Sequence, residues 1–345
     1  MNANRDADYR NVPFKYIEPD IWQIPTLVTI QALVAFGANL AGWNIDPISF
    51  FFIPIIAAIL FWREQSYTII KDYLGFNTKN IAQKVMSSII GACLGVSLYL
   101  ILKYSRVSLI PYASYNIAEL STMSPGVELS SVLNSLPIIF VFAAILSAML
   151  ILVAKKLKPS HILSIVITLT IPFLFIVAKP VGILNLIIGY GEEILCLIFA
   201  MIAINWLIYN FKLKYNSVTT HLIGWSIARA SWAVIHALST YGFVLGAYLS
   251  AFLLGMVFTL IGYMFWFAEL AIPILLIFGG LDIYYGYVYG IDLLWYLGAI
   301  LIAAAFTVMV DKKIFRDDSL AFREYVIYGA AMAHAFYDLS FVLFA

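Results

Sequence analysis

Long apolar runs dominate this chain of 345 residues and limit what it can fold into more than any other feature. A helix needs about 20 apolar residues to cross the hydrocarbon core of a membrane, which is about 30 Å thick. The fold class that we expect is therefore all-α, a polytopic transmembrane helical bundle. The sequence predicts about eleven spans, at 21–43, 46–62, 83–102, 134–154, 161–178, 182–210, 222–240, 244–266, 269–286, 288–310 and 324–345.

The composition excludes two broad classes of protein. Hydrophobic residues make up 63% of the chain and the mean hydropathy is +0.95, which is too apolar for a soluble enzyme. The 20 basic and 19 acidic residues balance to a net charge of +1, so there is no basic field to favour a nucleic-acid partner. Membrane lipids are instead the expected surroundings.

Basic residues between the spans predict the orientation, because loops on the cytoplasmic side of a membrane are enriched in Lys and Arg. With eleven spans, 16 of the 20 basic residues fall on the side of the N-terminus, and Lys103, Arg106 and Lys179 fall on the other. Merging the weak pair of spans 244–266 and 269–286 into one would move the basic loop 311–323 to the other side, which favours keeping them separate. We therefore expect a plasma-membrane protein with its N-terminus in the cytoplasm and its C-terminus outside.

Charged or titratable side chains inside predicted spans are candidates for function, because burying them in lipid is costly. Glu192 and Glu193 are neighbours in one span, and adjacent helical residues point about 100° apart. We expect one carboxylate to do chemistry and the other to brace the site. Glu269 and Asp282 lie near predicted span ends, where a charge at the membrane interface is the simpler interpretation.

Two further spans carry histidines. Arg229, Trp232 and His236 are spaced i, i+3 and i+7, so they share one helix face. His334 and Asp338 are four residues apart, so the carboxylate can accept the imidazole N–H and fix the tautomer of the ring. A carboxylate with two histidines can activate water, either as a general base with oxyanion donors or as ligands of zinc. Proton relays use the same residue types.

In this order the motifs resemble those of the CAAX-processing protease and bacteriocin-processing family, the intramembrane peptidases typified by the Ras-converting enzyme. That family carries Glu-Glu-x-x-x-Arg, then Phe-x-x-x-His, then His-x-x-x-Asn or Asp. The matching stretches here are Glu192 to Leu197, Trp232 to His236 and His334 to Asp338. The resemblance covers about residues 182 to 345, and 247–258 also resembles the helix that follows the second motif in relatives.

The chain departs from the family pattern in three places. Leu197 stands where the family has Arg, Trp232 replaces Phe, and 97 residues separate His236 from His334. The family Arg steadies the second glutamate, and Arg229 is the residue that could take over that task. The long separation implies an inserted helix pair near 269–310. The domain organisation that follows is a polar cytoplasmic tail at 1–20, N-terminal transmembrane helices at 21–180 and a protease-like core at 181–345.

The resemblance implies hydrolysis of a peptide bond in a membrane-associated peptide or lipidated-protein substrate, for which a prenylated peptide is one option. Glu192 would be the general base, His236 would share its work, and His334 with residue 338 would stabilise the oxyanion. An ionised Asp338 cannot donate a hydrogen bond, so it would orient His334 instead. Glu193, Arg229 and Trp232 would support the site. The family motifs leave open whether the site works without a metal or with zinc bound by Glu192, His236 and His334.

Two other functions stay open on the sequence. The missing Arg allows a catalytically degenerate member of the family that acts as a membrane binding or scaffold protein. Scattered acids in the spans allow a proton-coupled transporter that uses Glu192, Glu193 and Arg229. Convergence of the three motifs in one pocket would favour hydrolysis, and a continuous aqueous path would favour transport.

Overall fold

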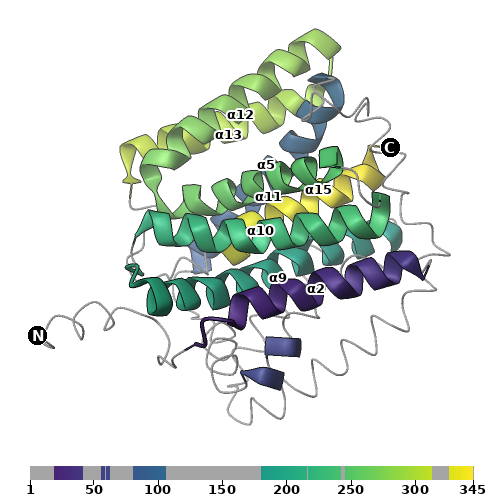
Figure 1. Ribbon diagram of the computed structural model, residues 1–345. Coiled ribbons are helices and arrows are strands. Elements are labelled where there is room, and N and C mark those ends of the chain that lie inside the picture. The colour runs from purple at the N-terminus through teal and green to yellow at the C-terminus, as the bar shows by residue number, and fades with distance from the viewer. Residues whose placement is uncertain are drawn as a thin grey trace, which may run out of the picture. The chain divides into compact units, whose positions relative to one another are not determined.

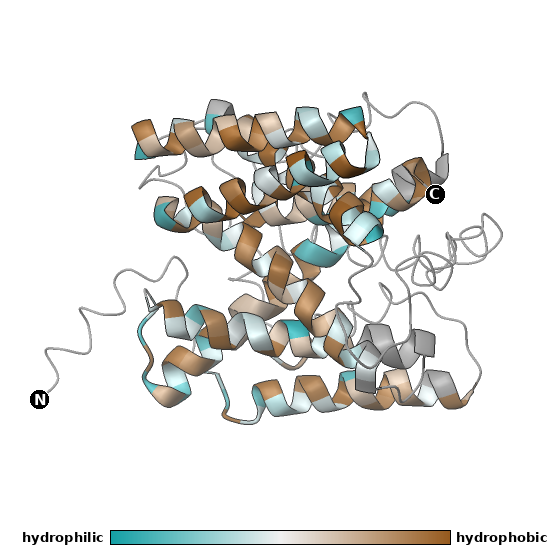
Figure 2. Ribbon diagram, turned by 90° about the horizontal axis from the view of Figure 1, so that it is seen from above, coloured by the Kyte–Doolittle hydropathy of each residue, from teal (hydrophilic) through white to brown (hydrophobic). Residues whose placement is uncertain are grey.

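The structure is a computed structural model that describes residues 19–41, 56–58, 60–62, 81–105, 180–215, 217–241, 245–312 and 326–344. In this part of the chain every regular element is helical (Figure 1), and six helices are long and apolar enough to cross a membrane. The chain is therefore an all-helical membrane protein. Hydrophobic residues occur along every coloured helix, with more polar positions between them (Figure 2). The expected spans 134–154 and 161–178, the tail before residue 19 and most of 46–62 lie outside the described residues.

The expected spans that are described correspond to separate helices. They are α2 (Gln23–Leu40), α5 (Ile81–Ser105), α9 (Pro180–Phe211), α10 (Val218–Tyr241), α11 (Leu245–Trp266), α12 (Ala268–Tyr289), α13 (Asp292–Val310) and α15 (Ala331–Leu343), the last continuing the π-helix η2 (Val326–Ala330). Phe267 has an extended backbone and separates α11 from α12, so two separate helices lie where the sequence predicts two spans. Gly290, in the left-handed conformation with φ of 64°, ends α12 before α13 begins.

The chain forms two compact units, each built from separated segments. The first unit includes 195–255, hence the C-terminal part of α9, all of α10 and the first half of α11, and it also contains α2. Inside it α2 packs on α10, where Ser231 donates a hydrogen bond to the Gln31 side chain. This division into units does not test the expected domain boundaries at 20/21 and 180/181, which stay predictions.

The second unit contains α5, the start of α9, α12, α13, η2 and α15. Its closest packing joins α5 to α15 and η2 through small residues: a Cβ at Gly91 or Gly95 would collide with the backbone of Gly329 or Ala333. Such contacts are how membrane helices approach closely. Tyr99 adds an edge contact to Phe341, with ring centroids 4.7 Å apart. This packing holds α15, which carries the third motif, in place.

The hairpin of α12 and α13 is the expected helix pair near 269–310. The two helices lie side by side (Figure 1), and Gly279 and Gly298 face each other closely enough that a Cβ on either would press on the other's carbonyl. At one end of the hairpin Glu269 and Lys312 form an exposed ion pair at 3.6 Å. At the other end exposed aromatic side chains gather, as expected at a membrane interface: Tyr284, Tyr287, Tyr289, Trp295 and Tyr296.

Candidate functional site

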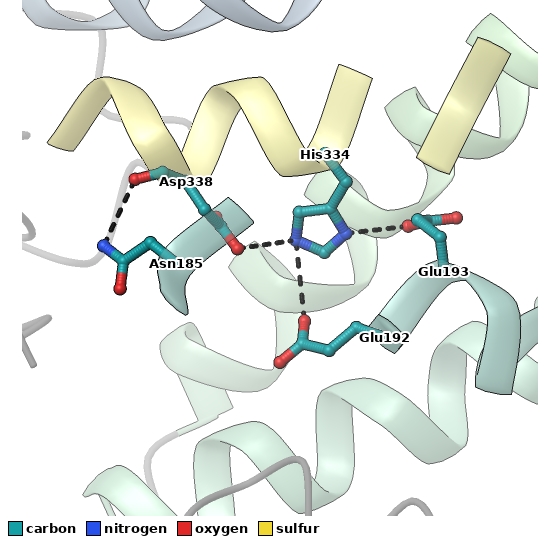
Figure 3. A network of polar contacts seen from close by, with 5 residues as sticks. All are labelled: Asn185, Glu192, Glu193, His334 and Asp338. Carbon is teal, nitrogen blue, oxygen red and sulfur yellow. Dashed lines mark hydrogen bonds and ion pairs between the residues drawn. The ribbon is translucent and has the colours of Figure 1, made fainter. Parts of the chain in front are cut away.

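His334 is the centre of a buried polar cluster formed by α9 and α15 within the second unit (Figure 3). Nδ1 of His334 lies 2.9 Å from Oε1 of Glu193, which is a hydrogen bond. On the other edge of the ring, Nε2 lies 3.5 Å from Oε2 of Glu192 and 3.7 Å from Oδ2 of Asp338. The structure thus brings together four of the residues that the sequence selected.

The two adjacent glutamates reach the same imidazole from opposite sides. Because neighbouring helical residues diverge by about 100°, Glu192 and Glu193 flank the ring and meet different nitrogens. An ionised carboxylate only accepts hydrogen bonds, so Nδ1 donates to Glu193. That bond fixes the plane of the ring and directs Nε2 toward Glu192 and Asp338.

Asp338 does not make the hydrogen bond that its spacing from His334 predicted. Its Oδ2 is 3.7 Å from Nε2, which is ion-pair range but beyond a hydrogen bond. Glu193 of α9 accepts the imidazole hydrogen bond instead. The predicted hydrogen-bond acceptor, Asp338, is therefore wrong. The reason is tertiary: α9 passes close to α15 at Gly189, where an added Cβ would lie 2.5 Å from Oδ2 of Asp338.

Burial divides the cluster into an inner and an outer part. The side chain of Glu193 is fully buried, and those of Glu192 and His334 are 6% and 4% exposed. The side chain of Asp338 is 22% exposed and so marks the side from which the cluster can be reached. Nε2 of His334, which faces Asp338, is therefore nearer the more exposed side of the cluster than Nδ1 is.

Neighbouring side chains hold the cluster in shape. The ring of Phe258 stacks on the His334 imidazole, with centroids 4.3 Å apart and planes 12° apart. An aromatic face in this position favours a positively charged imidazole. The amide of Asn185 donates to the backbone carbonyl of Asp338 at 3.3 Å, tying α9 to α15 one turn further along. The sequence does not predict a role for Asn185. Phe258 was noted only as part of the stretch 247–258, which resembles a family helix.

Three selected residues lie on α10, in the first unit. Arg229 and Trp232 are buried there, and the Arg229 guanidinium lies 5.4 Å from the Trp225 ring centroid. Gly255 of α11 leaves room for the Arg229 side chain. His236 belongs to α10, but its side chain lies outside the described residues. The contribution of these three residues to the cluster therefore stays a prediction.

Asp282 corrects the sequence interpretation of a solvated interfacial charge. Its side chain is fully buried in α12, and Oδ2 accepts a hydrogen bond of 2.6 Å from Ser97 of α5. The misreading arose because the predicted span ended at 286, whereas α12 continues to Tyr289. Glu269, by contrast, is exposed as expected.

A metal ion needs several donor side chains converging on one point. No group of three or more His, Cys, Asp or Glu side chains within the described ranges is arranged to hold one. The suggested zinc ligands include His236, whose side chain is outside those ranges, so that set stays untested. Comparison of the chain with known protein families, with curated proteins and with solved structures finds no match.

Proposed function

We propose that the chain is an intramembrane endopeptidase that hydrolyses a peptide bond in a membrane-associated substrate, with prenylated proteins as one candidate class. One observation carries the proposal: the buried cluster presents a carboxylate, Glu192, beside Nε2 of His334, on the edge of the imidazole opposite the Glu193 hydrogen bond. A base and a hydrogen-bond donor side by side are what water needs to attack an amide.

In the proposed reaction Glu192 accepts a proton from water as the water oxygen attacks the carbonyl carbon. The carbonyl oxygen becomes an oxyanion and accepts a hydrogen bond from Nε2–H of His334, whose positive charge Glu193 stabilises through Nδ1. The C–N bond then breaks, and Glu192 returns its proton to the leaving amine. Asp338, the most open member, would orient the ring and accept hydrogen bonds at the entrance.

The missing family Arg is consistent with this scheme because Glu193 has another partner. In the family pattern the Arg steadies the second glutamate, and Leu197 occupies that position here as a buried apolar residue. The hydrogen bond from Nδ1 of His334 supplies a donor to Glu193 directly. We propose His236 as a further participant in the site, with Arg229 and Trp232 in support.

The proposal includes a topology of eleven spans in the plasma membrane, with the N-terminus cytoplasmic and the C-terminus outside. Its support is the asymmetry of the basic residues along the sequence. Single cysteines at Ser121 and Ser319, in a chain lacking Cys93 and Cys196, should be labelled by impermeant reagents from opposite faces. Labelling of both from the same face would contradict the topology.

Replacement of Glu192 tests the chemistry. Glu192→Gln keeps the shape of the side chain but removes the basic oxygen, so turnover should fall by about 10²–10⁴-fold. Purified protein in lipid vesicles would be given a set of prenylated and unmodified peptides, and native membranes would be searched for new protein N-termini. The matched control is Glu269→Gln, which neutralises an exposed glutamate far along the chain. Equal cleavage by wild type and Glu192→Gln would contradict a hydrolytic role.

A second candidate, proton-coupled transport, is favoured by the burial of Asp282 in another membrane helix. Transport would require proton uptake by vesicles that depends on both Asp282 and Glu192. The scaffold role would be supported if partners bind equally to wild type and to Glu192→Gln and neither cleaves any peptide.

A further inference from the structure

A second buried acidic site lies where α5 meets the α12–α13 hairpin. Asp282 of α12 has no exposed surface, and neither does Ser97 of α5, whose hydroxyl donates to Oδ2 of Asp282 at 2.6 Å. The other carboxyl oxygen, Oδ1, is buried without a hydrogen-bond partner among the described residues. Among the described residues, an ionised Asp282 would therefore have one hydrogen-bond donor for its two carboxylate oxygens.

The position of Asp282 along α12 places it inside the membrane. It follows Glu269 by thirteen residues and precedes Tyr289 by seven, which is about 20 Å and about 10 Å along a helix axis. Glu269 is in the exposed ion pair at one end of the hairpin, and Tyr289 belongs to the aromatic group at the other. Asp282 therefore lies between the two interfaces that these side chains mark.

The hydrogen bond to Ser97 belongs to a regular contact between two parallel helices. Seven residues after Ser97, the carbonyl of Tyr104 accepts a hydrogen bond of 2.9 Å from the hydroxyl of Tyr289, seven residues after Asp282. The equal spacing means that α5 and α12 run in the same direction with two polar contacts two turns apart. The Ser97–Asp282 hydrogen bond is thus one of two hydrogen bonds between α5 and α12 with matching spacing.

Among the described residues, those around Asp282 include no cation that would balance an ionised carboxylate. On α5 the titratable neighbour is the thiol of Cys93, one turn before Ser97, and it interacts with Asp282 electrostatically. On α13 the neighbour is Gly298, where an added Cβ would lie 3.2 Å from the Asp282 Cβ. An unbalanced carboxylate in such a place is energetically costly, and binding a proton removes that cost.

We propose that Asp282 and Ser97 form a proton-binding site in the membrane interior, separate from the His334 cluster. The ligand is a proton, held by Asp282 as a carboxylic acid while Ser97 donates to the other oxygen. Two oxygens suit a proton better than a sodium ion, which needs several oxygen ligands. Occupancy by the proton would let the hairpin pack on α5, and release would leave a charge that loosens this packing.

Infrared spectroscopy of the full chain in lipid discs tests the site at neutral pH. Protein labelled with ¹³C at aspartate carboxyl groups separates aspartate bands from those of Glu192 and Glu193. We expect a protonated-carboxyl band that Asp282→Asn abolishes and Glu192→Gln leaves in place. Asp292→Asn, which changes an exposed aspartate at the start of α13, is the matched control and should also leave the band.

A spectrum without that band, or one in which Asp292→Asn removes it equally, would overturn the proposal. If Asp282→Asn does not fold, Ser97→Ala retains the carboxyl group and answers the same question. Loss of the serine hydrogen bond should shift the protonated-carboxyl band, whereas a shift of the ionised-carboxylate band would show that no proton is bound. Because Glu192→Gln is measured in the same series, this result is independent of any hydrolytic activity.

Discussion

The span Val326–Leu343, which ends in α15, and helix α13 are both long enough to cross a membrane, yet they differ in what surrounds them. The span that includes α15 is 72% buried and is the least apolar of the six, whereas α13 is 33% buried and is the most apolar. In water the most apolar helix would be the most buried, but lipid is itself apolar and takes over that contact. Of these two spans, the more polar one is therefore the one that faces protein.

The difference also explains where charge is tolerated. Glu192, Glu193, His334 and Asp338 sit together on well-buried stretches of α9 and α15, where each can meet a partner. On the hairpin the charges Glu269 and Lys312 lie at the end, exposed to water. Asp282 is the exception, since it faces α5 rather than lipid.

Removing the centre of the cluster should have the largest effect. His334→Ala leaves Glu192, Glu193 and Asp338 facing one another without the imidazole, and we expect a loss of about 3–5 kcal/mol in stability. Denaturation of the protein in mixed micelles would measure it. The matched control is Thr307→Ala on α13, whose hydroxyl bonds only to a carbonyl of its own helix, Ala303, and whose loss should be small. A His334→Ala protein as stable as Thr307→Ala would mean that the cluster does not hold α9 to α15.

Adding a methyl group at Gly189 should cause the second-largest loss of stability. Gly189→Ala places a Cβ 2.5 Å from Oδ2 of Asp338 and 3.0 Å from the His334 carbonyl oxygen, so we expect a loss of about 1–3 kcal/mol from overpacking. Gly280→Ala on the hairpin meets nothing within 4 Å and should be neutral or slightly stabilising. Thermal unfolding of the pair in the same detergent gives the comparison. Equal shifts would show that α9 and α15 can move apart freely.

The sequence predicted the described helices and the residues of the cluster, but it did not predict how those residues pair. Apolar runs set the limits of α9, α12 and α13 within a few residues, because span length depends on membrane thickness. The i, i+4 spacing placed His334 and Asp338 on one turn. The partner of Nδ1 was missed, since contact between α9 and α15 depends on Gly189 and on tertiary packing that no local pattern encodes.

Asp282 shows the same limit from the other direction. Its distance from the end of the predicted span made it look interfacial, and three more residues of helix were enough to place it inside. Nothing within α12 identifies Ser97 as its partner, because the two are 185 residues apart in the chain. A buried acid in a lipid-facing hairpin is recognised only once the neighbouring helix is known.

The stacking of Phe258 on His334 provides a smaller test of the core. Phe258→Leu keeps an apolar side chain but removes the aromatic face, 4.3 Å from the imidazole, that favours its charged form. We expect a stability loss of about 0.5–1.5 kcal/mol. Thermal unfolding of wild type and Phe258→Leu in the same detergent measures the loss. Equal stability of the two proteins would mean that the aromatic face contributes nothing beyond an apolar contact.

The exposed ion pair at the end of the hairpin should contribute least to stability. Its small contribution, set against the large one of the buried His334 cluster, tests the comparison most directly. Glu269 and Lys312 are 60% and 58% exposed at 3.6 Å, so water screens them and their pairing is expected to contribute about 0–1 kcal/mol. Glu269→Gln and Lys312→Met should each lower the thermal midpoint slightly, and the double variant should lose no more than the larger single effect. High salt should erase the difference between wild type and Glu269→Gln, because exposed charges are screened within about one Debye length. The His334→Ala loss should persist in the same salt, since buried charges are screened far less. If salt diminished both losses equally, water would reach the His334 cluster as freely as the hairpin end, and the contrast between a protein-facing core and a lipid-facing hairpin would fail.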